Sequence, residues 1–407
     1  MKPTVLLIGT FDTKGAEYAF VRSCILERGH GVLTMDLGIL GEREGPGFPV
    51  DVSAEEVAIA GGGSLATLRE RRDRGSAVLV MLAGSRVLTR RLFADGRAGG
   101  VLGLGGGGGT AMITAAMREL PVGVPKVMVS TMASGNTAPY VDVKDVTMMY
   151  SVVDIAGLNP LSRRILHNAA GAICGMLERS APVSNAGGRP LIAATMFGVT
   201  TPCVTVARER LEAEGYDVLV FHATGSGGRA MEGLIDDGYF AGVLDVTTTE
   251  WADEVVGGVL TAGPRRLSAA GRKGIPQVVS VGAVDMVNFG APETLPDRFR
   301  ARTIYRHNPS VTLMRTTPQE CRAIGRRIAE QLSRAAGPVA LMLPLQGVSM
   351  LDAPGQPFHD DEADRALFAA LHEHAGPNVA VHDLDLHIND VPFAHALADE
   401  LLTRLRS

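Results

Sequence analysis

The sequence predicts an α/β protein of two tandem Rossmann-like units, whose parallel sheets are covered by helices. Short apolar runs of strand length alternate with segments of helical periodicity along the chain. One strand–helix–strand pattern occurs twice, and glycine-rich loops follow several of the predicted strands. Because 407 residues exceed what one ordinary hydrophobic core accommodates, two domains are expected.

The first copy of the repeated pattern lies close to the N-terminus. Residues 5–8 form an apolar run that predicts a buried strand, and residues 9–15 predict a polar loop. Helical spacing of apolar residues follows at 16–28, where Gly29 is placed to end the helix. The next strand is expected at 32–35.

The second copy predicts a strand at 191–195, a helix at 201–213 and a strand at 218–221. The two copies align at one constant offset, which pairs Phe11 with Phe197, Gly29 with Gly215 and Val32 with Val218. After an insertion in the first half, the correspondence continues, with 100–102 matching 242–244 and 123–125 matching 274–276. Such a series of ordered matches indicates an internal repeat of two divergent units.

The boundary between the units is expected at 180–188, which lacks apolar periodicity and is rich in turn-forming residues. This gives a first, nucleotide-binding unit at 1–182 and a second unit at 188–407 with a C-terminal strand–helix extension. The apolar helix at 161–177 is expected to bridge the halves and to contribute to a dimer interface. The extension is expected to complete the second sheet, with strands at 339–343 and 379–381 and helices at 318–332, 361–374 and 391–405.

Composition excludes several classes of protein. A net charge of −5 argues against a nucleic-acid-binding protein, and basic runs such as 69–72 are interpreted as solvated helix faces. The four cysteines form no CxxC pair, which fits reduced thiols in the cytosol. With neither a signal sequence nor an apolar run of transmembrane length, a cytoplasmic protein that contacts no membrane is expected.

The segment 103–110, GLGGGGGT, is the strongest candidate for a ligand site. It lies between a predicted strand at 101–102 and a helix at 111–117. Backbone N–H groups of glycines can approach phosphate oxygens closely, and the N-terminus of the helix adds a partial positive charge. The alternative is a flexible turn, but five consecutive glycines carry a large ordering entropy that a turn does not require.

Two further loops in the first unit follow predicted strands and are expected at the same edge of the sheet. In 10–15, Lys14 is a candidate for pairing with phosphate, although helix capping alone explains Asp12 and Thr13. The small polar residues of 130–136 suit a ribose or phosphate contact, against an ordinary loop. The predicted nucleotide-binding residues are Phe11, Asp12, Thr13, Lys14, Gly105, Gly106, Gly107, Gly108, Gly109, Thr110, Ser130, Met132, Ser134, Gly135 and Asn136.

The second unit offers candidate residues for another ligand. A second anion-binding loop is expected at 225–228, and the segment 247–250 occupies the repeat position of the glycine run. The predicted second-ligand residues are Gly225, Ser226, Gly227, Gly228, Thr248, Glu250, Gln346 and Gly347. Arg265 and Arg266 are either counter-charges or exposed residues. The clusters at 359–361 and 382–387 are interpreted as solvated loops in preference to a metal site, so no metal ligands are assigned.

Several long phrases of the sequence resemble a known family. They are TFDTKG at 10–15, GLGGGGGT at 103–110, STMASGN at 130–136, MMYSVVDIAGLN at 148–159, HNPSVTLMRTT at 307–317 and PLQGVSMLDAPGQPFHD at 344–360. The chain is similar to the bacterial, fungal and plant family typified by the ATP-binding N-terminal region of the tomato mosaic virus resistance protein. The resemblance implies two Rossmann-like subdomains, binding of ATP with Mg²⁺, and a homodimer.

These observations lead to one main hypothesis and two alternatives. The main hypothesis is an ATP- and Mg²⁺-binding protein, in which the glycine run holds phosphates, Lys14 neutralises charge and Asp12 or Thr110 helps to hold Mg²⁺. An enzyme of this kind would act on a small carboxylate or sugar acid at a cleft between the units. The alternatives are a non-catalytic, nucleotide-gated regulatory protein, and an enzyme for another phosphorylated metabolite.

Overall fold

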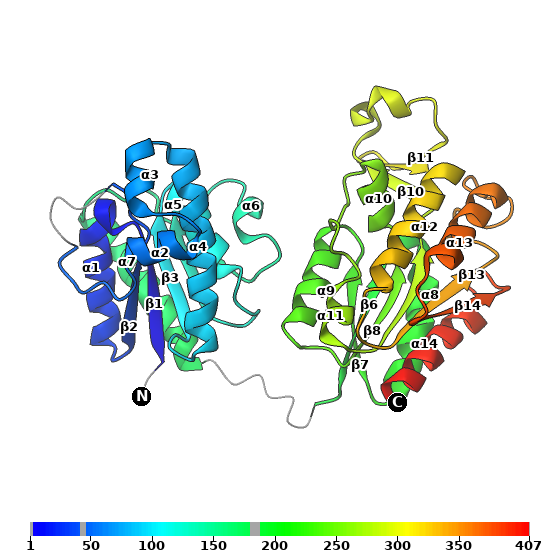
Figure 1. Ribbon diagram of the computed structural model, residues 1–407, viewed down its shortest axis with the longest axis horizontal. Helices are drawn as coiled ribbons and strands as arrows, with labels where there is room; N and C mark the ends of the chain where they lie inside the picture. The colour runs from blue at the N-terminus through cyan, green and yellow to red at the C-terminus, as the bar shows by residue number, and fades with distance from the viewer. Residues whose placement is uncertain (1–2, 41–45, 180–187, 407) are drawn as a thin grey trace. The chain divides into compact units, whose positions relative to one another are not determined.

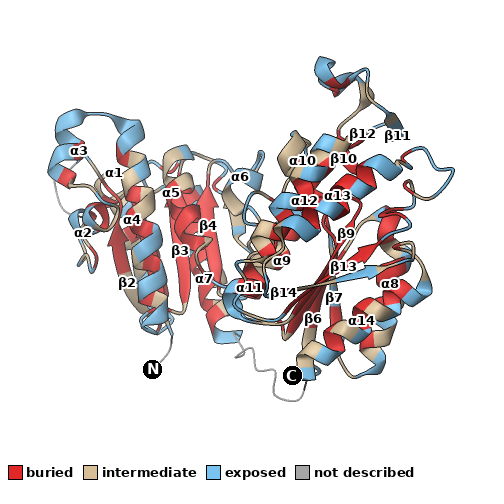
Figure 2. Ribbon diagram, turned by 45° about the vertical axis from the view of Figure 1, so that its right-hand side comes forward, coloured by how far each residue is buried: buried red, intermediate tan, exposed pale blue. Residues whose placement is uncertain are grey.

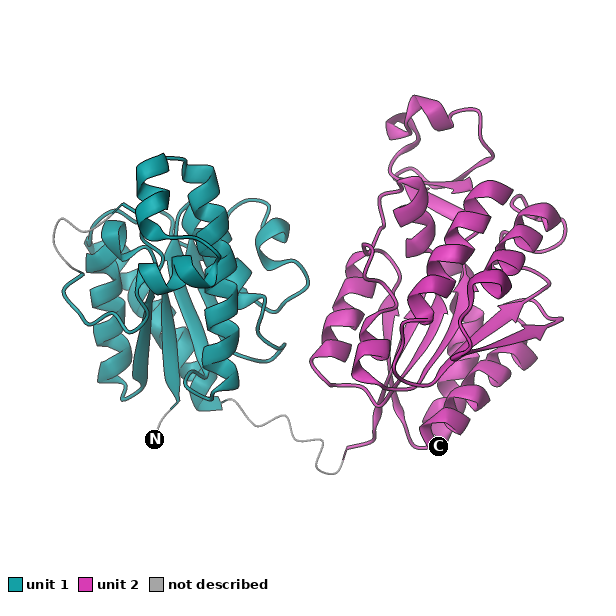
Figure 3. Ribbon diagram, viewed as in Figure 1, with its two compact units in different colours: residues 1–184 teal, residues 185–407 magenta. Residues whose placement is uncertain are grey.

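The computed structural model describes residues 3–40, 46–179 and 188–406. The chain divides into two compact units, Met1–Ser184 and Asn185–Ser407 (Figure 3). The expected boundary at 180–188 lies almost wholly outside the described residues. Each unit has its own parallel sheet and its own buried cores.

Unit 1 is a five-stranded parallel sheet with helices on both faces (Figure 1). The strand order is β2-β1-β3-β4-β5. Its strands are β1 (Thr4–Gly9), β2 (Gly31–Asp36), β3 (Gly100–Gly105), β4 (Lys126–Ser130) and β5 (Thr147–Tyr150). Its helices are α1 (Phe11–Glu27), α2 (Ala54–Ala60), α3 (Leu65–Arg71), α4 (Arg74–Ala94), α5 (Gly107–Met117), α6 (Ala138–Val141) and α7 (Pro160–Arg179).

Alternation of apolar residues along the strands supplies two cores in unit 1. Val5 and Leu7 of β1 belong to the core beneath α1 and α7, whereas Leu6 and Ile8 belong to the core beneath α2 to α5. All four side chains are fully buried, as expected for a central strand that is covered on both faces. The burial view shows the strands enclosed between layers of helices (Figure 2).

Helix α1 begins earlier than the sequence analysis expected. The predicted loop at 9–15 is wrong, because the helix starts at Phe11, with a local departure from helical geometry at Lys14. Asp36 at the end of β2 explains the early start, since its Oδ1 accepts a hydrogen bond from the Phe11 amide at 3.0 Å. The predicted helix end is confirmed, with Gly29 in the left-handed region at φ 79°.

Helix α7 belongs to unit 1. Its buried residues, among them Leu166, Ile173 and Leu177, pack in the core shared with α1 and the central strands. The core of unit 1 alone therefore explains the apolar residues of this helix, and a bridging role stays a prediction. Its apolar periodicity reflects burial against the sheet of its own unit.

Unit 2 is built around a six-stranded parallel sheet in the order β14-β13-β9-β8-β6-β7. These strands are β6 (Leu191–Met196), β7 (Asp217–His222), β8 (Gly242–Thr247), β9 (Gln277–Gly282), β13 (Val339–Pro344) and β14 (Val379–Leu384). The covering helices are α8 (Thr201–Ala213), α9 (Ser226–Asp236), α10 (Glu250–Val256), α11 (Ala269–Lys273), α12 (Pro318–Leu332), α13 (Asp361–His374) and α14 (Val391–Arg406). The predicted strands at 339–343 and 379–381 do complete this sheet.

The strand orders confirm the internal repeat. Reading from β2 in unit 1 and from β7 in unit 2, the orders are β2-β1-β3-β4-β5 and β7-β6-β8-β9-β13-β14. The matched strand pairs therefore take the same places in both sheets. Gly215 also ends its helix in the left-handed region at φ 92°, as its counterpart Gly29 does in the first copy.

Unit 2 contains a second, antiparallel sheet that the sequence analysis missed. Strands β10 (Met286–Phe289), β11 (Ile304–Asn308) and β12 (Val311–Arg315) pair in the order β10-β12-β11. Short 3₁₀ turns, η2 (Pro292–Thr294) and η3 (Asp297–Phe299), lie between β10 and β11, and η1 (Gly198–Thr200) precedes α8. In the part of the chain that the structure describes, no helix has the length and hydropathy needed to cross a membrane.

Candidate functional site

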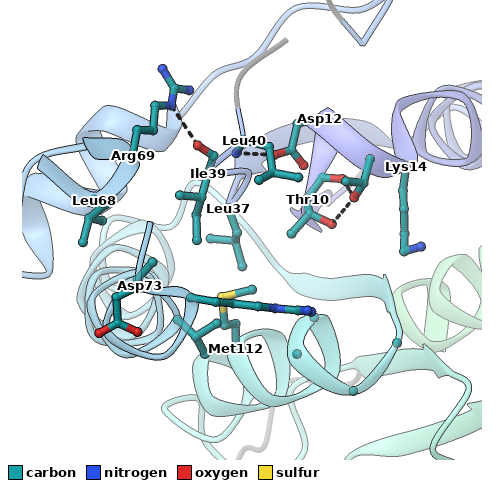
Figure 4. A pocket seen from close by; sticks show the side chains of 18 of the residues that line it. Thr10, Asp12, Lys14, Leu37, Ile39, Leu40, Leu68, Arg69, Asp73 and Met112 are labelled. Carbon is teal, nitrogen blue, oxygen red and sulfur yellow. Dashed lines mark hydrogen bonds between the residues drawn. The ribbon is translucent and has the colours of Figure 1, made fainter. Parts of the chain in front are cut away.

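Unit 1 contains a cavity of about 800 Å³ at the carboxyl ends of its strands. Its lining comes from the starts of α1, α4 and α5, from the loop after β2, and from α3 (Figure 4). The lining residues are Thr10, Asp12, Thr13, Lys14, Leu37, Ile39, Leu40, Leu68, Arg69, Arg72, Asp73, Arg74, Ala77, Val78, Gly106, Gly107, Gly108, Gly109 and Met112. This volume lies within the range of small-molecule sites in proteins.

The first turn of α5 contributes three backbone donors to this cavity. The helix begins at Gly107, so the expected helix start at 111 was too late. Gly106 is its N-cap and provides no side-chain cap. Among the described residues, no group accepts a hydrogen bond from the amides of Gly107, Gly108 or Gly109. We refer to the Gly106–Gly109 segment as the glycine cradle.

The glycines of this region serve two different purposes. A Cβ on Gly103 would lie 2.4 Å from Ile113 Cγ2, and one on Gly105 would lie 2.9 Å from the Thr110 nitrogen, so packing excludes side chains there. Cβ atoms on the four cradle glycines would meet their nearest neighbours at 3.7 to 4.0 Å, which is ordinary contact. None of the four has a positive φ. Protein packing therefore does not require glycine in the cradle, whereas close approach of a ligand does.

Cationic side chains line the cavity, and one of them lies beside the cradle. A Cβ on Gly108 would lie 3.8 Å from an Arg74 guanidinium nitrogen, so this cation lies beside the free amides. Arg69 and Arg72 also line the cavity, and Arg69 Nε donates to the Ile39 carbonyl at 2.8 Å (Figure 4). These arginines are exposed, as the sequence analysis expected, but they face a cavity. Their place in the cavity lining was missed.

Apolar side chains line the same cavity. Leu37 and Ile39 come from the loop after β2, Leu68 from α3, Val78 from α4 and Met112 from α5. Leu37, Leu68 and Met112 are buried. A cavity lined by free amides, cations and aliphatic side chains suits a ligand with a charged end and a flat or apolar end.

Three predicted residues of the α1 segment line the cavity: Asp12, Thr13 and Lys14. Asp12 Oδ2 accepts from the Leu40 amide at 2.9 Å, while Asp12 Oδ1 is buried without a hydrogen-bond partner among the described residues. Lys14 Nζ donates to the Ile155 carbonyl at 2.5 Å. Lys14 therefore borders the cavity with its ammonium group already held by the protein.

Other predicted nucleotide-binding residues lie outside this lining. Phe11 is buried against Tyr18 and Phe48, so its ring is part of the core. Thr110 and Ser130 are fully buried and share a hydrogen bond of 2.6 Å between their hydroxyl groups. Four more predicted residues follow β4 and do not line the cavity: Met132, Ser134, Gly135 and Asn136. Of these, Met132 comes near the cradle, since its sulfur would lie 4.0 Å from a Cβ on Gly107.

The glycine loop of unit 2 is occupied by a carboxylate of the protein itself. Glu250 Oε1 accepts hydrogen bonds from the amides of Gly225 at 2.6 Å and Gly228 at 3.2 Å. A Cβ on Gly228 would lie 2.3 Å from Glu250 Oε2. The side chain of Glu250 therefore explains Gly228, while Gly225 is required by its φ of 79° and by the Thr261 carbonyl, 2.6 Å from a Cβ there. The amides of both glycines are not free to bind an anion.

Arg266 neutralises this buried carboxylate. Its Nε donates to Glu250 Oε2 at 2.6 Å, and its terminal nitrogens donate to Asp245 at 2.5 and 2.7 Å. Burial acts to lower the pKa of Arg266, but attraction to Asp245 and Glu250 outweighs it and raises the pKa well above its usual value. Burial raises the pKa of the neighbouring Glu232. The sequence left Arg266 open as a counter-charge or as an exposed residue. It is a counter-charge, but its partners are buried acidic residues of the protein itself.

The remaining second-ligand candidates have internal contacts and stay predictions. Thr248 is fully buried and donates to the Ser280 carbonyl. Gln346 Nε2 donates to Asp385 Oδ1 at 2.5 Å, and Gly347 has a φ of 124°. Two further candidates lie at the start of α9: Ser226, whose amide donates to the Thr224 carbonyl, and Gly227, which packs against the His222 carbonyl. No group of three or more metal-ligating side chains occurs among the residues described.

The fold and the cavity define a tandem Rossmann-like α/β protein with a backbone-amide cradle in its first unit. Comparison with known families is consistent with this class. The chain belongs to the family described as uncharacterised protein family UPF0261, whose N-terminal domain matches residues 3–182 and whose C-terminal domain matches residues 189–405. The resemblance read from the sequence motifs is confirmed.

The relatives include bacterial proteins of similar length and longer plant proteins. A UPF0261 protein of Clostridium tetani is 52% identical over 406 residues, which cover 100% of both chains. The ToMV resistance protein Tm-1(GCR237) of Solanum lycopersicum is 43% identical over 418 residues, covering 98% of this chain but 55% of the tomato protein. The ToMV susceptible protein tm-1(GCR26) matches to the same extent.

Proposed function

We propose that unit 1 binds ATP together with Mg²⁺, with the phosphates on the glycine cradle. The observation that carries this proposal is the row of three backbone amides at Gly107, Gly108 and Gly109 that lack acceptors among the described residues. Helix N-termini bind phosphate because their free N–H groups and the helix dipole both favour negative charge. Arg74 beside Gly108 adds a full positive charge at the same place.

The cavity also accommodates the rest of a nucleotide. Five aliphatic side chains of the lining suit contact with the flat face of a purine: Leu37, Ile39, Leu68, Val78 and Met112. The choice of ATP over other nucleotides follows from the family resemblance. Another phosphorylated metabolite with an apolar end would meet the same contacts, so a direct comparison of ligands is part of the test.

The residues present fit a magnesium ion at one of the two expected positions. Asp12 Oδ1 is a buried carboxylate oxygen without a partner among the described residues, and oxygen ligands of this kind are those that Mg²⁺ prefers. Thr110 does not fit, because its hydroxyl is buried and bonded to Ser130. Asp12 would hold the ion beside the bound phosphates, and the ion would neutralise part of their charge. Lys14 would add a further charge after leaving Ile155.

Isothermal titration calorimetry of the full chain with ATP and Mg²⁺ tests the proposal. Saturable binding is expected, and Gly108→Asp should weaken it at least tenfold, since a carboxylate would occupy the cradle. An acidic residue is compatible with the first turn of a helix, so this variant should fold. Ser64→Asp is the matched control, because it adds the same charge at the N-terminus of α3 outside the cavity lining. Absence of saturable heat at millimolar ATP would contradict the proposal.

Turnover is a separate question from binding. Phosphate release measured with a panel of small carboxylates and sugar acids distinguishes an enzyme from a nucleotide-gated regulatory protein. A regulatory protein should instead change its oligomeric state when ATP is added. Product formation with one acid, abolished by Gly108→Asp, would identify the enzyme.

A further inference from the structure

Unit 2 has a groove of its own. Its first part lies between α10 and α12, which are side by side (Figure 1), and its second part lies between the segment 264–272 and the end of α12. It consists of a cavity of about 360 Å³ and an adjoining hollow of about 280 Å³, which share Pro264, Gln331 and Arg334 in their linings. We name it the arginine groove and define it by the charged and aromatic residues that line it: Trp251, Glu254, Arg265, Arg272, Arg326, Arg327, Glu330 and Arg334.

The spacing along α12 explains why the arginines gather. Arg327, Gln331 and Arg334 are three or four residues apart, so they share one face of the helix or its immediate continuation. The opposite face packs on α13, where a Cβ on Gly325 would lie 2.7 Å from the Leu367 carbonyl. The arginines therefore face the groove because the other side of the helix is committed to the core.

Several of these guanidinium groups have no counter-ion in the part of the chain that the structure describes. Within the described residues, the side chains of Arg265, Arg327 and Arg334 form neither a hydrogen bond nor an ion pair. Arg272 is held by both carboxylate oxygens of Asp236, at 2.9 and 2.7 Å. Arg326 lies 3.8 Å from Glu330, which is a loose pair. Since Glu254 already accepts a hydrogen bond from Thr261, the groove retains an excess of positive charge.

Trp251 provides an independent observation at the same place. Its side chain lines the cavity although the residue is only 4% exposed. Its Nε1 is buried and has no hydrogen-bond partner among the residues described. Buried indole N–H groups usually have an acceptor, so this donor indicates a missing partner. Attraction of arginines to the C-terminal end of α12 would account for Arg334, but for neither Arg265 nor the indole.

We propose that the arginine groove binds a small polyanion, a molecule with two or more phosphate or carboxylate groups. The planar fork of guanidinium donors matches either group in a bidentate fashion. Two adjoining hollows with unpaired arginines on both sides suit a ligand with charges at both ends. This site is separate from the cavity of unit 1 and does not depend on nucleotide binding there.

The sequence supplies a direct reporter, because Trp251 is the only tryptophan of the chain. Titration of the full chain with pyrophosphate or citrate, at constant ionic strength set with KCl, should change tryptophan emission saturably at submillimolar to millimolar concentration. The double variant Arg327→Ala/Arg334→Ala should weaken this binding at least tenfold. Arg322→Ala is the matched control, since Arg322 is exposed on the same helix but does not line the groove, and it should bind as the unchanged protein does.

Calorimetry in the Gly108→Asp background supplies the second measurement. Because this variant blocks the glycine cradle, any heat from pyrophosphate or citrate must come from another site. A response to pyrophosphate alone identifies phosphate groups as the ligand chemistry, and a response to citrate alone identifies carboxylates. The proposal is overturned if both measurements show no saturable binding, if the double variant binds normally, or if Gly108→Asp abolishes the signal.

Discussion

Two helices of this protein begin in glycine-rich segments after a parallel strand, and they use their free amides differently. At α5 the amides of Gly107 to Gly109 face a cavity with no acceptor among the described residues. At α9 the amides of Gly225 and Gly228 are held by Glu250. Glu250 comes from the segment that occupies the repeat position of the glycine cradle. In unit 2 that position therefore supplies an internal anion, whereas in unit 1 it leaves room for an external one.

The largest effect is expected from removing the internal anion. Glu250→Ala should destabilise unit 2 by about 3–5 kcal/mol. The substitution removes one acidic partner of buried Arg266 and leaves the amides of Gly225 and Gly228 without an acceptor. Urea unfolding of the full chain measures this loss, and ATP binding at unit 1 should persist below the transition. Glu209→Ala on the exposed face of α8 is the control. An unchanged unfolding midpoint would show that the buried carboxylate is not needed.

A second expected difference between the units concerns pH. Burial, together with the charges of Asp285 and Asp364, raises the pKa of Asp352 to about 9, and burial raises that of Asp285 to about 6. The folded state therefore binds more protons than the unfolded state above pH 3.8, so stability should fall as pH rises from about 4 to 9. The slope is up to about 1.4 kcal/mol per pH unit for one such group.

Asp352→Asn tests this origin of the pH dependence. The amide cannot ionise, so the slope of unfolding free energy against pH should become shallower above pH 6. Arg315 lies at 3.1 Å from Asp352 and also contacts Asp364 at 2.8 Å, so it retains one acidic partner in the variant. A slope equal to that of the unchanged protein would assign the pH dependence to other groups.

Neighbouring glycines of unit 1 should respond in opposite ways to alanine. Gly103→Ala is expected to lower the stability of unit 1 by about 1–3 kcal/mol, because the new Cβ would lie 2.4 Å from Ile113. Thermal unfolding monitored by circular dichroism provides the measurement. A neutral result would mean that β3 and α5 can separate to admit a methyl group.

The smallest change in stability is expected for Gly108→Ala, which should stabilise unit 1 where Gly103→Ala destabilises it. Gly108→Ala should stabilise unit 1 by about 0.5–1 kcal/mol, since the position is helical and the methyl group meets no close neighbour. ATP affinity should nevertheless fall, because a methyl group on the cradle would hinder the close approach of phosphate. Calorimetry and thermal unfolding of the same sample test both parts. Stabilisation without loss of ATP affinity would show that the phosphates do not bind at the cradle.

The sequence predicted the repeat, the parallel sheets and the glycine segment, because apolar periodicity and strand-end loops are local signals. It did not predict β10, β11 and β12, whose antiparallel pairing joins strands of mixed exposure outside the repeat. It also missed the contribution of α3 and α4 to the cavity. Arg69 and Arg72 look like solvated charges in sequence, and only the tertiary fold brings them into the cavity lining, where Arg74 lies beside Gly108.

The predicted anion-binding loop at 225–228 shows what a glycine pattern cannot predict from sequence alone. Its glycines carry the same local pattern as the cradle, but the residue that fills it, Glu250, is distant in sequence and arrives through the sheet topology. A glycine pattern predicts close approach of a partner and does not say whether that partner is a ligand or a side chain. Locating the nearest buried carboxylate is what separates the two cases.

The glycine cradle has a practical consequence for experiments on this family. Its proposed donors are main-chain amides, which no substitution with a natural amino acid other than proline removes. Truncating side chains to alanine, the usual survey of a binding site, would leave every one of these donors in place and report only on Arg74 and its neighbours. A survey that adds side chains to the cradle, or replaces single amides with esters by chemical synthesis, would address the donors themselves.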